Sequence, residues 1–121
     1  MLEYDDNNVF AKILNKELPC KKVNEDEKNL CFEDINKQAP VHVLTIPKGK
    51  YTNLETFVEN ASNEEIVTFI KTIVKSARNM GVLSSGYRVI INSGGDGNQE
   101  VPHLHAHVLG GGNLGPMITK T

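Results

Sequence analysis

The stretch Pro-His-Leu-His-Ala-His-Val-Leu-Gly-Gly, residues 102–111, decides how this chain folds. Polar and apolar residues alternate along it, which is the pattern of a half-buried β-strand. Alternate side chains of a strand point to one face, so His103, His105 and His107 should project together. Three imidazoles that titrate near neutral pH indicate either a site of chemical reaction or a metal site.

Other short-range patterns predict the rest of an α+β fold. Asparagine at position 7 or 8 can cap a short helix over 9–14, and a capping box of Ser62 and Glu65 opens a long helix that Gly81 ends. The expected strands span 22–24, 30–34, 41–46, 87–92 and the histidine stretch. Because most strands follow one another through short connections, we expect an antiparallel sheet of about five strands with one long and one short helix.

The composition and charge argue against several classes of protein. The 121 residues suffice for one domain, and the net charge of −2 with scattered Lys and Arg argues against a nucleic-acid or anionic-membrane binder. No apolar stretch approaches the ~18 residues of a membrane span, and the first residues are acidic rather than signal-like. The two cysteines, Cys20 and Cys31, are expected to be reduced thiols, which favours the cytoplasm.

Strand geometry weighs against one metal ion held by all three histidines. Neighbouring alternate residues lie ~6.6 Å apart, so two of them can share a zinc ion, but His103 and His107 start ~13 Å apart. A third ligand would have to come from elsewhere, and His42 is the only other histidine in the sequence. A metal protein is therefore the weaker alternative.

Nucleophilic catalysis on phosphorus fits the surroundings of the histidines better. A neutral imidazole is a competent nucleophile when a neighbour fixes its tautomer, and adjacent imidazoles can hold a phosphate and donate a proton. The glycine-rich loop 93–100 lies just before the histidines and can present backbone N–H groups to phosphate oxygens. The sequence thus favours phosphate chemistry over metal binding.

Motifs outside this stretch carry a family resemblance. They are Phe32-Glu33-Asp34-Ile35, Gln38-Ala39-Pro40-Val41-His42, Ile46-Pro47-Lys48, Gly86-Tyr87-Arg88, Asn92 and Gly110-Gly111. Together with the three histidines they resemble the histidine triad superfamily over about residues 9–112, and the paired glycines favour its Hint branch, the purine nucleoside phosphoramidases. The resemblance implies a single histidine triad (HIT) domain over 1–121 with an irregular tail at 113–121, no metal or other cofactor, and a homodimer whose two sheets join.

The resemblance also assigns a role to each site residue. His105 would attack the α-phosphorus of a purine nucleoside phosphoramidate or adenylate and form a nucleotidyl-histidine that water hydrolyses. His107 would contact the phosphate and assist the leaving group, the backbone carbonyl of His103 would orient His105, and His42 would complete the cluster. The nucleotide pocket would consist of Asp34 at the ribose, Phe32 and Ile35 at the purine, and Asn92, Asn98, Gln99 and Glu100 on the phosphate side.

Three departures from the family pattern affect this interpretation. Gly112 stands where many relatives have arginine, and Glu100 stands where animal relatives have serine, so we expect only the Glu100 backbone N–H to serve phosphate. Asn8 and Ala11 occupy positions where some bacterial relatives have zinc-binding cysteines, so that zinc site should be missing. The alternatives are a dinucleoside polyphosphate hydrolase or nucleotidyl transferase, an enzyme that acts on aminoacyl adenylates, and a nucleotide-binding scaffold with residual activity.

Overall fold

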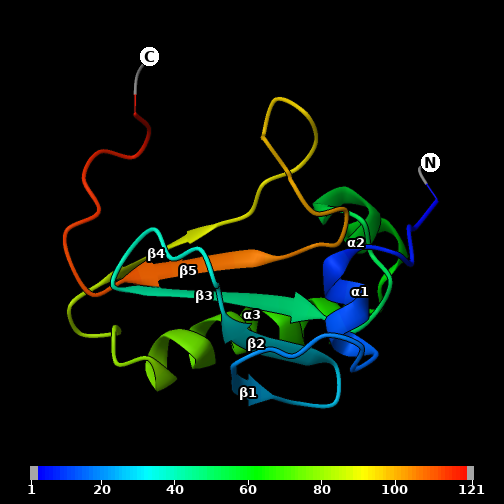
Figure 1. Ribbon diagram of the computed structural model, residues 1–121, viewed down its shortest axis with the longest axis horizontal. Helices are drawn as coiled ribbons and strands as arrows, with labels where there is room; N and C mark the ends of the chain where they lie inside the picture. Colours follow the sequence, from blue (N-terminus) through cyan, green and yellow to red (C-terminus); the bar gives the residue numbers. More distant parts are fainter. Residues whose placement is uncertain (1–2, 120–121) are drawn as a thin grey trace.

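Within residues 3–119, the part of the chain that the computed structural model describes, five strands form a sheet in the order β1-β2-β3-β5-β4 (Figure 1). The strands are β1 (Lys22–Glu25), β2 (Asn29–Glu33), β3 (Val41–Pro47), β4 (Tyr87–Ile90) and β5 (Ala106–Gly110). Each neighbouring pair runs antiparallel. The predicted antiparallel α+β fold is therefore confirmed, and β5 lies in the interior of the sheet.

Of the three helices within residues 3–119, two begin where the sequence predicts. The side chain of Asn8 caps α1 (Val9–Leu14), and a capping box of Ser62 and Glu65 opens α3 (Asn63–Asn79). Gly81 follows α3 with a φ of 75°, a conformation that favours glycine. The structure adds α2 (Leu54–Asn60), which the sequence analysis did not predict. This helix has only seven residues and buries only Phe57, so it has no recognisable apolar stripe.

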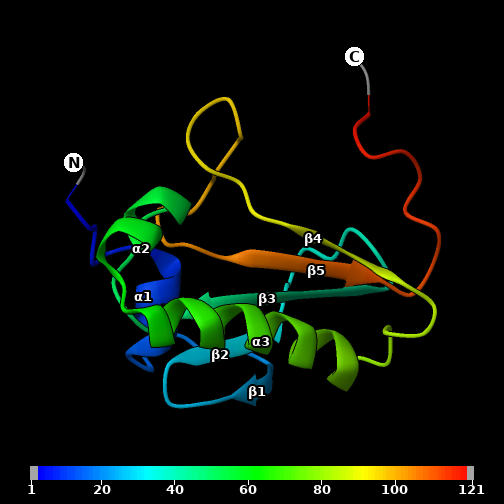
Figure 2. The same cartoon turned by 180° about the vertical axis from the view of Figure 1, so that it is seen from behind.

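α3 lies across one face of the sheet (Figure 2) and builds the main core there. Its residues Phe69, Ile73 and Ala77 are buried in one cluster with Val43, Ala106 and Val108 of β3 and β5. A second buried cluster joins α1 to the other face of the sheet through Phe10, Leu30, Phe32, Leu44 and Ile46. In residues 3–119 the structure contains no helix of the length and hydrophobicity that a membrane crossing requires.

The histidine stretch is only partly a strand, and this corrects the sequence-based expectation. β5 begins at Ala106, so His103 and His105 precede it and only His107 lies on the strand. The backbone N–H of His103 donates to the carbonyl of Val101, and that of Leu104 donates to the carbonyl of Tyr51. The first of these bonds is local, and the second ties the segment to the chain just before α2 instead of to a neighbouring strand. The fourth strand is also shorter than expected, since it ends at Ile90.

Candidate functional site

A cavity of about 310 Å³ opens on the sheet face that α3 does not cover. In the register of β3 with β5, Leu44 lies opposite His107 and His42 opposite Leu109, so these side chains share that face. Six of the residues predicted for the site line the cavity: His42, Asn92, Asn98, Glu100, His105 and His107. Strands β3 and β5, the loop 93–100 and the segment before β5 thus meet around one space.

The other predicted site residues lie outside the cavity lining. His103 and Phe32 are buried, and Phe32 packs edge-on against Phe10. The side chain of Ile35 is 96% exposed. The Gln99 side chain holds the loop 93–100 instead, because its amide group donates to the carbonyls of Thr52 and Val101 and its oxygen accepts the N–H of Gly94.

Asp34 lies next to His42 but is not among the residues that line the cavity. One of its carboxylate oxygens is 3.3 Å from His42 Nε2, and the other accepts the backbone N–H of Asn36. Asp34, His42 and His107 each offer a ligand atom within 4.8 Å of the other two, so this cluster could hold a metal ion. The donor set of two imidazoles and a carboxylate suits zinc or another transition metal.

Backbone atoms fix the ring of His105. Its Nδ1 lies 2.7 Å from the carbonyl oxygen of His103, and because a carbonyl can only accept, Nδ1 carries the proton. A neutral ring then has an unprotonated Nε2. The ring of Phe10 packs edge-on against His105 with centroids 5.0 Å apart and limits its rotation from the other side.

The ring of His103 is fixed at both nitrogens. Nε2 lies 2.9 Å from the carbonyl oxygen of Pro47 and donates to it, so Nδ1 is the acceptor in the neutral ring. The hydroxyl of Tyr4 donates to that Nδ1 at 2.6 Å. His103 is fully buried, and both of its ring nitrogens have a hydrogen-bond partner.

A second chain of hydrogen bonds assigns the tautomer of His107. The backbone N–H of Gln38 donates to His42 Nδ1 at 3.1 Å, so neutral His42 carries its proton on Nε2. That Nε2 lies 2.9 Å from His107 Nδ1 and donates to it. His107 then carries its own proton on Nε2, and its ring lines the cavity. The site therefore presents one basic ring nitrogen on His105 and one N–H on His107.

Burial keeps the outer two histidines of the triad neutral. It lowers the pKa of His103 to about 4, although the hydrogen bond to Pro47 opposes the shift. The pKa of His107 is also lowered to about 4, because the ring is buried and lies close to His105 and His42. Desolvation disfavours the charged form of an imidazole, so both rings are uncharged at neutral pH.

The other two histidines shift in the same direction. Burial lowers the pKa of His105, while the hydrogen bond to His103 and the charges of Asp34 and Glu100 oppose the shift. Burial likewise lowers the pKa of His42 against the opposing charge of Asp34. A ring that must attack an electrophile needs its unprotonated form, which these shifts favour at pH 7.

Several residues around the histidines were not predicted from the sequence to belong to the site. Phe10 and Leu44 line the cavity, but the sequence shows them only as apolar positions of a helix and a strand. Gln38 also lines it and lies four residues before His42, within the same motif. Tyr4 is 99 positions from its partner His103, so only the folded structure brings the two together.

Comparison with known proteins gives a consistent result. A family model described as the HIT domain matches residues 15–114. An uncharacterised 13.2 kDa HIT-like protein of Azospirillum brasilense is 54% identical over 97% of this chain and 96% of that protein. The purine nucleoside phosphoramidase of Escherichia coli is 37% identical over 91% of this chain and 92% of its own length. The solved structure of a histidine triad protein from Clostridium difficile is 38% identical, with a TM-score of 0.83 over 97% of this chain and 100% of that one.

Proposed function

This chain belongs to the HIT domain family, and from that premise we propose that it hydrolyses the P–N bond of purine nucleoside 5′-phosphoramidates through a nucleotidyl-histidine intermediate. The observation that carries the proposal is the hydrogen bond from His105 Nδ1 to the carbonyl of His103. It leaves His105 Nε2 unprotonated on a ring that lines the cavity. The name of the Escherichia coli relative supports the choice of a P–N bond.

In the first step His105 Nε2 forms a bond to the α-phosphorus while the bond from phosphorus to the amine nitrogen breaks. The departing nitrogen takes a proton from solvent and leaves as a neutral amine, while the Nε2–H of His107 donates a hydrogen bond to the phosphate. In the second step water attacks the same phosphorus and releases His105, and the proton lost by the water returns to solvent. The products are a nucleoside monophosphate and an amine, and both rings are in their starting tautomers.

The nucleotide-binding roles form a second part of the proposal. Asn92, Asn98 and the backbone N–H of Glu100 serve the phosphate from the cavity wall. Asp34 accepts the ribose hydroxyls, because a carboxylate can accept two hydrogen bonds from a vicinal diol. Phe32, Ile35 and Gln99 complete the pocket predicted by the motifs. Asp34→Asn should raise the KM for an AMP phosphoramidate while leaving kcat within a few-fold, and an unchanged KM would exclude Asp34 from the ribose.

The central experiment is to trap the intermediate. The protein is mixed with adenosine 5′-phosphoramidate, quenched after a few milliseconds, digested and analysed by mass spectrometry for AMP attached to His105. His105→Ala should lose turnover by at least roughly a thousandfold and still bind AMP. Full activity of that variant would refute the assignment of the nucleophile. Tight AMP binding with no adduct and no turnover in the wild type would favour a nucleotide-binding scaffold instead.

Dinucleoside polyphosphates and aminoacyl adenylates are alternative substrates that could form the same intermediate. A nucleotidyl transferase would use an acceptor other than water in the second step. The ratio of kcat/KM for adenosine 5′-phosphoramidate to that for diadenosine tetraphosphate separates the first of them. We expect the phosphoramidate to react faster. A higher kcat/KM for diadenosine tetraphosphate would refute the proposed function and identify a polyphosphate hydrolase instead.

The cluster of Asp34, His42 and His107 supports a second candidate, a metal-binding protein. Our proposal requires no metal, and chelation followed by elemental analysis decides between the two. Activity that survives exhaustive chelation in zinc-free protein excludes a metal role. Activity lost on chelation and restored by zinc would establish one.

We further propose that two copies pair along β4 and that the protein acts in the cytoplasm. β4 forms one edge of the sheet, and its residues Tyr87 and Val89 are 36% and 40% exposed. Light scattering should give twice the 13.4 kDa of one chain, and Val89→Lys should give a monomer while Val58→Lys on α2 does not. Cys20 and Cys31 are both free thiols, which suits a reducing compartment.

A further inference from the structure

The charge of the cavity is unusual for a site that is to receive a phosphate. Among the described residues that line it, the only Asp, Glu, Lys or Arg is Glu100. A polyanion therefore meets no lysine or arginine in the lining and one carboxylate.

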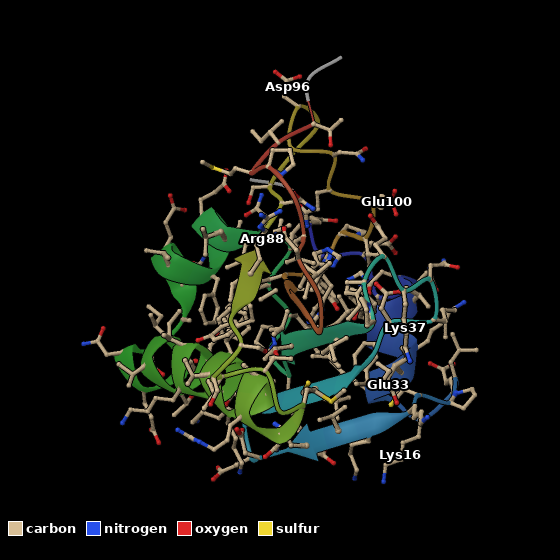
Figure 3. The ribbon with its side chains drawn as sticks, turned by 90° about the vertical axis from the view of Figure 1, so that its left-hand side faces the viewer. Lys16, Glu33, Lys37, Arg88, Asp96 and Glu100 are labelled. Carbon is tan, nitrogen blue, oxygen red and sulfur yellow. The ribbon has the colours of Figure 1, made fainter. Side chains whose placement is uncertain are left out.

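The Glu100 side chain is also available to a ligand. Within residues 3–119 the structure gives its carboxylate no hydrogen bond and no ion pair, and the residue is exposed. Figure 3 shows Lys37 on the same side of the molecule, and Lys37 is already paired with Glu33. Arg88 is likewise occupied, because it donates to the carbonyls of Gly115 and Pro116.

We propose that Glu100 selects substrates by the charge of their leaving group: it favours phosphoramidates whose amine carries a further positive charge and disfavours those with an anionic or polyphosphate leaving group. The inference rests on the proposed function and adds a specificity determinant to it. Glu100 and His105 line the same cavity, so a leaving group on the α-phosphorus departs within the field of this carboxylate. Two unit charges about 7 Å apart change a rate by roughly threefold at the dielectric constant of water and by roughly fiftyfold at an effective dielectric constant of about 20, so we take roughly fivefold for the exposed Glu100 carboxylate. Attraction of a cation and repulsion of an anion together give a ratio of roughly twentyfold.

The test uses amidates of AMP with three amines of similar length: ethylenediamine, propylamine and β-alanine. Their remote ends are cationic, neutral and anionic at pH 7.5. Values of kcat/KM are measured at low salt for the wild type, Glu100→Gln, Glu100→Asp and Asp96→Asn. Comparing the same compounds across variants cancels their different intrinsic reactivities, so the quantity of interest is the cation-to-anion ratio of each variant.

Asp96→Asn is the matched control. Asp96 lies on the same loop as Glu100, farther from the sheet (Figure 3), and loses the same charge in this variant. It is not among the residues that line the cavity. Glu100→Asp retains the carboxylate and should retain most of the selectivity. Circular dichroism spectra of all variants show whether each is folded.

We expect the cation-to-anion ratio to fall roughly twentyfold in Glu100→Gln and to stay near the wild-type value in Asp96→Asn. Addition of 0.5 M salt to the wild type should reduce its ratio, because salt screens exposed charges. An equal ratio in wild type and Glu100→Gln would overturn the inference and leave the proposed function intact. An equal fall in Asp96→Asn would also overturn it, because the effect would then follow net charge. No turnover of any amidate by the wild type would overturn the proposed function itself and the inference with it.

Discussion

The hydrogen bond from Tyr4 to His103 offers a direct test of how the histidine cluster is held. Tyr4→Phe removes one hydroxyl and leaves the rest of the ring in place. His103 Nδ1 then has no donor in the described part of the chain, while Nε2 keeps its bond to Pro47. The substitution therefore tests the hydrogen bond at Nδ1 of His103 separately from the one at Nε2.

The expected loss of stability follows from the burial of His103. A neutral hydrogen bond contributes about 1 kcal/mol, and a buried acceptor left without a donor costs about 1–3 kcal/mol. His103 is fully buried but Tyr4 is only partly buried, so we take a value in the middle of this range. We therefore expect the free energy of unfolding to fall by about 2 kcal/mol.

The same substitution should change the titration of His103. A hydroxyl that donates to Nδ1 stabilises the unprotonated ring, so its removal raises the pKa of His103 above the wild-type value of about 4. Turnover should fall less than tenfold, because the backbone carbonyl that holds His105 stays in place.

Urea unfolding followed by circular dichroism measures the stability, and NMR titration of the imidazole resonances measures the pKa. Tyr51→Phe is the control, since it removes the bond from Tyr51 to Glu65 at 2.7 Å and leaves the histidine rings untouched. It should cost a similar free energy without moving the His103 titration. An unfolding free energy of Tyr4→Phe within about 0.3 kcal/mol of the wild type would refute the reasoning, as would an unchanged His103 pKa.

Three further predictions concern pH, the loop and the core. The unfolded chain protonates His103 and His107 near pH 6.5 but the folded chain only near pH 4. Stability should therefore be full above pH 6.5 and should fall by about 3 kcal/mol for each of the two rings as the pH drops to 4. Urea titrations that give one value across this range would contradict this. In Gly97→Ala the new Cβ would lie 2.5 Å from the carbonyl oxygen of Ser93, so the loop must open. AMP affinity measured by calorimetry should then fall about tenfold. An unchanged affinity would show that the loop does not contribute to the site. Phe57→Ala should lower the free energy of unfolding, measured by thermal unfolding, by about 3–5 kcal/mol because the ring is buried. Val58 is 57% exposed, so Val58→Ala should lower it by less than about 0.5 kcal/mol. Equal losses would show that Phe57 does not hold α2 in place.

The sequence predicted the sheet and its longest helix because their signals are local. The capping box of Ser62 and Glu65 can be recognised from four consecutive residues. Apolar residues recur at helical spacing along the whole of α3. The sequence predicts a start of β5 that is too early, because the contact that prevents a strand at His103–His105 is made with a distant part of the chain. His103 to His105 alternate as a strand does, but the N–H of Leu104 bonds to the carbonyl of Tyr51, which no periodic pattern indicates.

The candidate site divides in the same way. His42, Asn92 and the loop 93–100 could be identified because they lie in recognisable motifs, and the structure brings them around one cavity with His105 and His107. Their catalytic and binding roles stay predictions. The contacts of Tyr4 and Phe10 with the histidines could not be predicted, because they join the two ends of the chain.

The hold of the His103 carbonyl on His105 has a consequence for reading mutational data. Every amino acid placed at position 103 keeps a backbone carbonyl, so no codon change deletes the acceptor that orients the reactive ring. The side chain at 103 is instead buried between Tyr4 and Pro47, so a saturation library should tolerate few replacements there and should lose them as insoluble or unfolded protein. Losses at position 105 should leave soluble protein without turnover. An activity assay alone would not distinguish the two positions, because variants at both lose turnover. A measurement of the amount of soluble protein would distinguish them.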